Sequence, residues 1–255
     1  MSANDRLSTT ERLSTEDYVR RRLNPNCFDH DYIHLKDLAF FLGGVAPDFF
    51  GDVFDYGCGG APYASLFSHC RSYVPADLEP GPKVKRVLRN DGTTTESDAS
   101  YDFVVSTQVL EHVRNPLAYL RECHRILRPG GEILLTTHGM ATEHGCPNDF
   151  YRWTSRGLEE LLRSGGFEVL KSGKLTTEIR CSIQLLHLFA NCLRRPTRPG
   201  WHLCLSLMRK FYRVILMPVF NRWADFFPEQ RLVPAEAPDS IYLGVFIRAK
   251  KPVTA

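Results

Sequence analysis

The sequence predicts an α/β fold built on a mostly parallel sheet. Across residues 51–173, short runs rich in β-branched and aromatic residues alternate with amphipathic stretches that have cap residues and glycine stops. Strands that alternate with helices in this way are typical of a parallel sheet covered by helices on both faces. The length of 255 residues and the 43% hydrophobic content suit one domain with an elaboration.

The N-terminal elements come first in the prediction. Residues 1–15 are rich in Ser, Thr and charged side chains, so we expect a disordered or loosely attached tail. A helix is predicted over 34–44, because Leu35, Leu38 and Leu42 repeat at helical spacing. Strands are then predicted, in chain order, at residues 51–57, 72–79, 101–107, 132–139 and 167–173.

Helices are predicted between these strands. Asn115 and Pro116 are suitable N-cap and first-turn residues for a helix over 116–127, which Pro129, Gly130 and Gly131 end. Further helices are predicted over 63–70 and 154–166, and the strand ending at 107 runs into a short helix.

The alternation stops after residue 177. Residues 178–230 favour helices without strands, and a late strand follows in SIYLGVFIRAKK. The block carries eight basic and three acidic residues, a net charge of +5. It suits a cap over an acceptor, a homodimer surface, or a peripheral contact with anionic membrane. We favour the first two, because the apolar segments also suit burial against the sheet.

Charge and cysteine content limit the partners and the location. The net charge of +3 gives no reason to expect nucleic acid. The eight cysteines are scattered singly, without zinc spacing, which argues against a metal site or a disulfide framework. The polar N-terminus lacks a signal peptide and no apolar run reaches about 18 residues, so a cytoplasmic location is expected.

The loop VFDYGCGGAPY, residues 53–63, predicts a nucleotide-like ligand. Its glycines follow a strand, but Pro62 stands where the dinucleotide fingerprint needs its last glycine, which weakens an NAD reading. Asp55, at the strand end, suits a cation better than a pyrophosphate. S-adenosylmethionine carries such cationic groups together with a ribose diol, and Asp77 is placed to accept hydrogen bonds from that diol.

Residues 53–173 resemble the class I S-adenosylmethionine-dependent methyltransferases, especially the branch that acts on small molecules and glycans. The motifs are DYGCGG, PADLE, RNDG, STQVLEHVRNP, LRPGGEILLTT and HGCPNDFYRWTSRGLEELLRSGGFEV. The resemblance implies a Rossmann-like, seven-stranded, mostly parallel sheet with helices on both faces. The expected parts are a tail (1–15), a helical flank and cofactor-binding core (16–177), a helical insertion (178–230) and a final strand (231–255).

The resemblance also implies a set of cofactor residues. They comprise the glycine motif and the later strand ends: Asp55, Gly57, Cys58, Gly59, Asp77, Leu78, Asp91, Thr107 and Gln108. Three positions depart from the family pattern, since Ala61 replaces a frequent glycine, Pro75 interrupts the second strand, and Asn148 replaces a common histidine. Cys58 is expected to be a small apolar filler and not a nucleophile.

The expected reaction is methyl transfer to a hydroxyl, less readily an amine, of a small molecule, sugar, secondary metabolite or lipid-linked acceptor. His144 and His112 are the candidate general bases, because both fall in loops beyond strand ends; His112 could instead brace a helix, and His138 is expected to be structural. No metal is required. The alternatives are a non-catalytic S-adenosylmethionine-binding subunit and an NAD-dependent oxidoreductase.

A substrate wall is expected immediately after the last motif loop. Tyr151, Arg152 and Trp153 would form it, with Arg152 binding an anionic group, or they would only pack the loop against the sheet.

Overall fold

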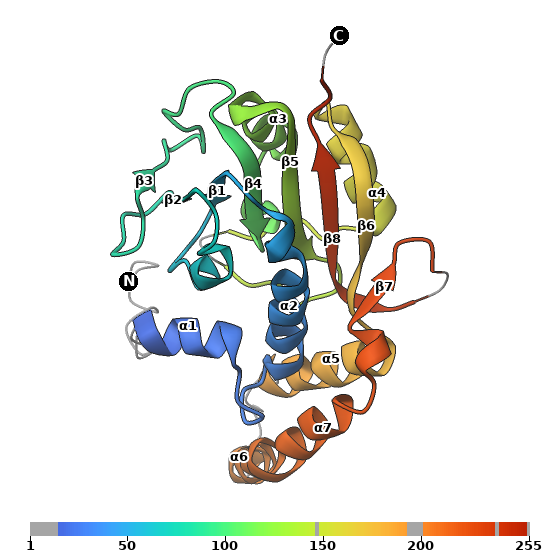
Figure 1. Cartoon of the computed structure of the whole chain (residues 1–255). Helices are drawn as coiled ribbons and strands as arrows, with labels where there is room; N and C mark the ends of the chain where they lie inside the picture. The colour runs from blue at the N-terminus through green and yellow to red at the C-terminus, as the bar shows by residue number, and fades with distance from the viewer. Residues whose placement is uncertain (1–14, 146–147, 193–200, 238–239, 254–255) are drawn as a thin grey trace.

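The computed structural model describes residues 15–145, 148–192, 201–237 and 240–253, which form one α/β unit (Figure 1). The predicted tail lies outside these residues apart from Thr15, the first residue of helix α1 (Thr15–Leu23). The chain then runs through α2 (Tyr32–Val45) into the sheet.

One sheet contains all eight strands of the described residues, in the order β3-β2-β1-β4-β5-β8-β6-β7. Their bounds are β1 (Asp52–Tyr56), β2 (Ser72–Asp77), β3 (Arg86–Val87), β4 (Tyr101–Thr107), β5 (Leu127–His138), β6 (Glu168–Thr177), β7 (Leu232–Pro234) and β8 (Tyr242–Lys250). Strands β1 to β5 pair in parallel, and β8 lies antiparallel between β5 and β6. The predicted mostly parallel α/β fold is confirmed, with eight strands instead of seven. The edge strands β3 and β7 span two and three residues, too few for a sequence pattern.

Two apolar cores cover the two faces of the sheet. On one face α2 contributes Leu38 and Phe41, which pack against Val53 of β1. On the other face α3 (Pro116–Ile126) and α4 (Ser155–Ser164) pack against the next residue, Phe54, and its neighbours. Successive side chains of a strand point to opposite faces, so a strand apolar at both positions needs helices on both sides.

The predicted helices over 116–127 and 154–166 are confirmed, and the short helix predicted after residue 107 is a 3₁₀ turn (Leu110–His112). The Asn115 side chain accepts a hydrogen bond from the Ala118 amide at 3.1 Å, and Thr154 does the same for Gly157 at 3.1 Å. The predicted helix over 63–70 is wrong, because only a 3₁₀ turn forms there (Ala64–Phe67). Ala61 has a φ of +48° and precedes Pro62, so the chain leaves the glycine loop through a turn, and β2 already begins at Ser72.

The predicted helical block lies beyond the carboxyl ends of β4 and β5 (Figure 1). It consists of α5 (Glu178–Cys192), α6 (Trp201–Phe211), a π turn (Tyr212–Leu216) and α7 (Met217–Ala224). A 3₁₀ turn (Pro228–Gln230) leads from it to β7. The block therefore stands on the side of the sheet where ligands of open α/β folds bind.

A buried ion pair fastens this block to α2. Arg180 of α5 and Asp37 of α2 are both fully buried, and the guanidinium donates two hydrogen bonds to the carboxylate, one of them from Nε at 3.0 Å. Arg180 also donates to the Ala224 carbonyl at the end of α7, and the Thr176 hydroxyl donates to Asp37 at 2.9 Å. One guanidinium thus joins three helices.

We expect Arg180→Met to lower the free energy of unfolding by about 3–5 kcal/mol, because it removes both guanidinium hydrogen bonds of the buried Asp37 carboxylate and leaves Arg231, with Nε 3.5 Å away, as its remaining cation. Urea denaturation followed by circular dichroism measures the change. Arg163→Met, which breaks a half-exposed pair with Glu159, is the control and should cost less than about 1 kcal/mol. Equal effects of the two substitutions would contradict the assigned role of Arg180.

Candidate functional site

The glycine loop after β1 is held against the end of β2. Gly57 has a φ of +81°, and a Cβ there would lie 2.6 Å from a methyl carbon of Val109. The Gly57 amide donates to the Ala76 carbonyl at 2.8 Å, and the Gly59 amide donates to Asp77 Oδ2 at 2.7 Å. Glycine is therefore required at position 57 for both backbone conformation and space.

Asp55 is a buried acid at the end of β1. Its side chain accepts a hydrogen bond from the Tyr73 hydroxyl. No Lys or Arg among the described residues pairs with it. Burial, reinforced by the nearby Asp77, raises the pKa of Asp55 to about 7. A buried carboxylate without a basic partner suits a cationic ligand group.

The other predicted cofactor residues surround this loop. Gln108 follows Thr107, the last residue of β4, and has a φ of +56°, while its buried side-chain oxygen has no hydrogen-bond partner. Leu78 is 47% exposed directly after β2, and Asp91 accepts hydrogen bonds from the amide and hydroxyl of Thr93. Burial raises the pKa of the Cys58 thiol far above its usual range, as expected for a filler.

These features fit S-adenosylmethionine. Asp55 would meet its ammonium group, Asp77 its ribose diol, and Gly57 and Gly59 let the backbone approach it closely. The individual assignments remain predictions.

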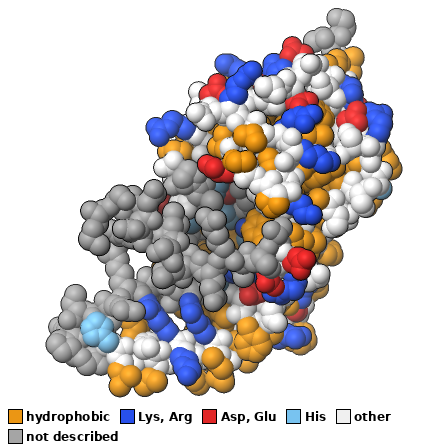
Figure 2. Space-filling view, turned by 90° about the vertical axis from the view of Figure 1, so that its left-hand side faces the viewer, with side chains coloured by type: hydrophobic (Ala, Val, Ile, Leu, Met, Phe, Trp, Pro, Cys, Tyr) orange, Lys and Arg blue, Asp and Glu red, His pale blue; other side chains and the backbone are white. Residues whose placement is uncertain are grey.

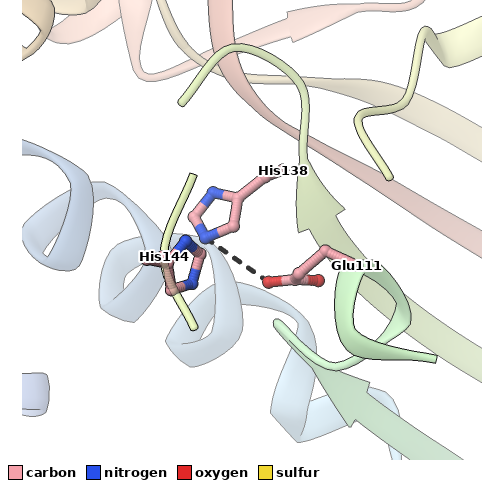
Figure 3. Close-up of side chains that lie close together, drawn as sticks. All are labelled: Glu111, His138 and His144. Atoms are coloured by element: carbon pink, nitrogen blue, oxygen red, sulfur yellow. Dashed lines mark ion pairs between the residues drawn. The ribbon is translucent and has the colours of Figure 1, made fainter. Parts of the chain in front are cut away.

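Four imidazoles gather around Glu111 beyond the ends of β4 and β5. The ring centroid of His144 lies 5.0 Å from that of His112 and 5.2 Å from that of His138, and His34 of α2 lies 5.4 Å from His138. Figure 3 shows Glu111, His138 and His144 converging from three segments. Glu111 is fully buried, accepts a hydrogen bond from Thr137 at 2.8 Å, and has Oε1 3.4 Å from His138 Nε2.

The two predicted bases are both members of this cluster. His144 has a side chain 42% exposed, and its Nδ1 lies 3.3 Å from Asp149 Oδ2. His112 is less exposed, and its Nδ1 lies 2.6 Å from the Asn148 carbonyl oxygen. A carbonyl oxygen only accepts, so Nδ1 of His112 carries the proton and Nε2 is left as an acceptor.

The other two histidines of the cluster, His34 and His138, are buried. Burial lowers the pKa of His34 to about 4 and holds the pKa of His138 well below its usual range. Both rings are therefore neutral at pH 7, and the structural role expected for His138 remains a prediction.

Arg152 is occupied by a neighbouring acid. It donates two hydrogen bonds of 2.6 Å to Asp149 and a third to the Thr142 carbonyl at 2.8 Å. Trp153 packs against the core, and the Tyr151 hydroxyl donates to the Arg114 carbonyl at 3.2 Å. These contacts match the packing alternative for the three residues, and binding of an acceptor by them remains a prediction.

Glu111, His34 and Asp149 are site residues that sequence reasoning did not single out. Glu111 lies in the LEHV motif, so the sequence could have indicated it as a site residue. His34 comes from a helix preceding the sheet, and only the fold brings it to the cluster.

The cluster can serve two chemistries. Glu111, His138 and His144 each offer one ligand atom, and these atoms lie within 4.8 Å of one another, so the set could hold a metal ion. The same imidazoles, oriented by carboxylate and carbonyl groups, also suit proton transfer.

An open pocket of about 490 Å³ lies beside this cluster. Loop residues from Gly139 to Thr142 and Arg152 form one wall, and Leu185, Leu188 and Phe189 of α5 form the other. The α5 wall of this pocket is apolar.

A family model described as a methyltransferase domain matches residues 28–172. The chain belongs to this methyltransferase family. It has the class I, Rossmann-like fold of this family, and S-adenosylmethionine is the cofactor. This membership favours the predicted donor over NAD.

Curated relatives match the core only. A probable S-adenosylmethionine-dependent methyltransferase of Mycolicibacterium smegmatis is 34% identical over 134 residues, 46% of this chain and 52% of the relative. A ubiquinone biosynthesis O-methyltransferase of Xanthomonas oryzae pv. oryzae is 31% identical over 101 residues, 33% of this chain and 42% of the relative. The matches thus span about half the length of these relatives.

Solved structures show the same fold. The [4+2]-cyclase SpnF has a TM-score of 0.53 at 19% identity, covering 85% of this chain and 82% of that chain. A 1,6-didemethyltoxoflavin-N1-methyltransferase of Burkholderia thailandensis has a TM-score of 0.51 at 15% identity, covering 93% and 87%. One neighbour is a cyclase, so the fold by itself does not fix the reaction. No helix in the described part of this chain is long and apolar enough to cross a membrane.

We expect S-adenosylhomocysteine to bind roughly eightfold more tightly at pH 7.5 than at pH 6. Its ammonium group prefers ionised Asp55, whose pKa is about 7, so affinity rises as the carboxyl loses its proton. Isothermal titration calorimetry at several pH values measures the effect. Asp55→Asn should bind weakly and with a flat profile over this range, whereas an unchanged slope in that variant would show that another group titrates.

Proposed function

We propose that this chain transfers a methyl group from S-adenosylmethionine to a hydroxyl oxygen of a small acceptor. The observation that carries the proposal is His144, an exposed imidazole whose Nδ1 faces the carboxylate of Asp149. It stands in the histidine cluster beyond the ends of β4 and β5, where an acceptor of this fold binds.

An oxygen acceptor needs a base, because it must lose its proton as the bond to carbon forms. Imidazole changes charge near neutral pH and is the commonest general base. Asp149 fixes the His144 ring with Nδ1 protonated, so Nε2 is free to accept the hydroxyl proton. Arg152 holds the pKa of Asp149 well below its usual range, so this carboxylate stays charged.

The cofactor supplies a methyl group on a sulfonium, which already has a good leaving group. The chain then contributes chiefly position and proton transfer, and holding an acceptor oxygen about 3 Å from its target is a large part of such catalysis. His112, with Nε2 available as an acceptor, is the second candidate base.

The acceptor carries an apolar portion in this proposal. The Leu185, Leu188 and Phe189 wall lies beside the cluster and supports this choice. The ubiquinone biosynthesis O-methyltransferase relative supports an oxygen acceptor, because that relative is named for O-methylation. A hydroxylated aromatic or a lipid-linked sugar would both meet these requirements.

The test is methyl transfer from labelled S-adenosylmethionine to matched hydroxyl and amine compounds, with products identified by mass spectrometry. The corresponding methyl ethers, whose oxygen is already methylated, serve as blocked controls. We expect turnover of the hydroxyl compounds, and His144→Asn should lower kcat by about 10²–10⁴-fold. The affinity for S-adenosylhomocysteine should stay within about twofold, because His144 does not line the glycine loop. His69→Asn, on an exposed histidine away from the cluster, is the matched control.

Other outcomes would separate the parts of this proposal. Failure of the folded chain to bind S-adenosylhomocysteine would overturn the cofactor site. Binding without turnover on any acceptor would favour a non-catalytic subunit. Full activity in both His144→Asn and His112→Asn would remove the imidazole base and leave methyl transfer standing.

We expect turnover to persist after dialysis against EDTA, since imidazole and not a metal ion takes the proton. The measurement is kcat before and after dialysis, with metal content followed by mass spectrometry. Loss of activity that zinc or manganese restores would instead assign Glu111, His138 and His144 to a metal ion.

A further inference from the structure

The helix formed by α6, the π turn and α7 presents an apolar surface to solvent. Leu203 is 67% exposed, Leu207 58% and Phe211 56%. Further large apolar side chains are exposed along the same segment and just after it, namely Met208, Val214, Ile215, Val219, Trp223 and Phe226. Contiguous exposed apolar surface of this kind marks a contact site, because isolated domains rarely keep it in water.

All charges on this helix have one sign. Residues 201–224 contain four basic side chains, Arg209, Lys210, Arg213 and Arg222, and no acid. Leu203, Leu207 and Phe211 recur every four residues and share one face, and Arg209 and Arg213 recur on another. Figure 2 shows basic side chains among apolar ones at the end of the molecule where Figure 1 places α6 and α7.

The charge pattern decides between possible occupants. A symmetric dimer through this surface would place the same basic side chains opposite one another with no acid from the helix to pair with them. An anionic bilayer offers apolar chains for Leu207 and Phe211 and phosphates for the exposed Lys210 and Arg213, whereas part of the Arg209 guanidinium is buried. Helices with Lys and Arg beside exposed aromatic and aliphatic residues are typical of this interfacial position.

We propose that α6 and α7 seat this chain on the surface of an anionic lipid bilayer. The helix lies in the plane of the headgroups without crossing, in agreement with the finding that no described helix could span a membrane. The pocket lies near this surface, because Arg213 of the π turn donates a hydrogen bond to Asn191 of α5 at 2.8 Å, and Phe189, two residues earlier in α5, lines the pocket.

The test is co-sedimentation of the full chain with vesicles of phosphatidylcholine alone or with 30% phosphatidylglycerol. We expect binding to the anionic vesicles only, weakened by raising salt from 0.1 to 0.5 M. Lys210→Gln with Arg213→Gln should weaken binding roughly 30-fold, since each basic residue near an anionic surface contributes roughly fivefold to the affinity for the vesicle. Leu207→Gln with Phe211→Gln should reduce binding at least as much.

Matched controls carry the same changes at other exposed positions. Lys83→Gln with Lys171→Gln removes two charges, and Leu170→Gln removes one exposed leucine of β6; both should bind like the unaltered chain. Thermal unfolding and S-adenosylhomocysteine binding confirm that each variant is folded. Absence of vesicle binding, or equal binding by test and control variants, overturns the proposal. A dimer in analytical ultracentrifugation that Leu207→Gln with Phe211→Gln dissolves, without vesicle binding, also overturns it in favour of a second copy.

Discussion

The buried contact between Arg180 and Asp37 governs how the two parts of this molecule fit together. Strand β8 follows the helical block in sequence and lies between β5 and β6, so the sheet closes only when the block has been placed beside the core. A small apolar cluster that includes Ile33, Ile183 and Ala224 packs the block against α2. Arg180 supplies the attachment, since it binds Asp37 of α2 and the carbonyl at the end of α7 at once. A buried charge is tolerated only where its bonds are satisfied, so this pairing also fixes the angle at which the block leaves the core.

The same helix, α2, carries parts of the site. His34 lies one turn before Asp37, so the residue that touches the histidine cluster and the residue that holds the block share a rigid element. The remaining members of the site come from strand ends, because the carboxyl ends of parallel strands meet at one edge of a sheet. Strands thus fix the position of the cofactor loop, whereas His144 and Asp149 are positioned by the loop after β5.

Much of the core could be predicted from the sequence, because local signals there agree with the fold. Local residue types indicate each of these elements: Asn115 and Thr154 cap helices, and the strands are apolar runs. In the glycine loop, the glycines indicate the backbone conformation and Asp55 indicates the ligand-binding acid. The failures came where local signals are weak. Segment 63–70 forms only a 3₁₀ turn, because the chain turns at Ala61 immediately before it. Strands β3 and β7 are too short to show an alternation of apolar and polar residues. The histidine cluster depends on contacts between residues about one hundred positions apart, such as His34 with His138, which no local pattern records.

The π turn between α6 and α7 has a geometric consequence. A π turn accommodates one more residue than a regular helix, and one residue corresponds to a rotation of about 100° about the helix axis. If all these residues formed one regular α-helix, Val219 and Trp223 would lie on a different side of it from Leu203 and Leu207. The extra residue at Tyr212–Leu216 brings the two halves back into phase, and Tyr212, at the same turn, is hydrogen-bonded to His187 of α5 at 2.5 Å. A local irregularity in the backbone thereby turns two short amphipathic helices into one continuous apolar edge.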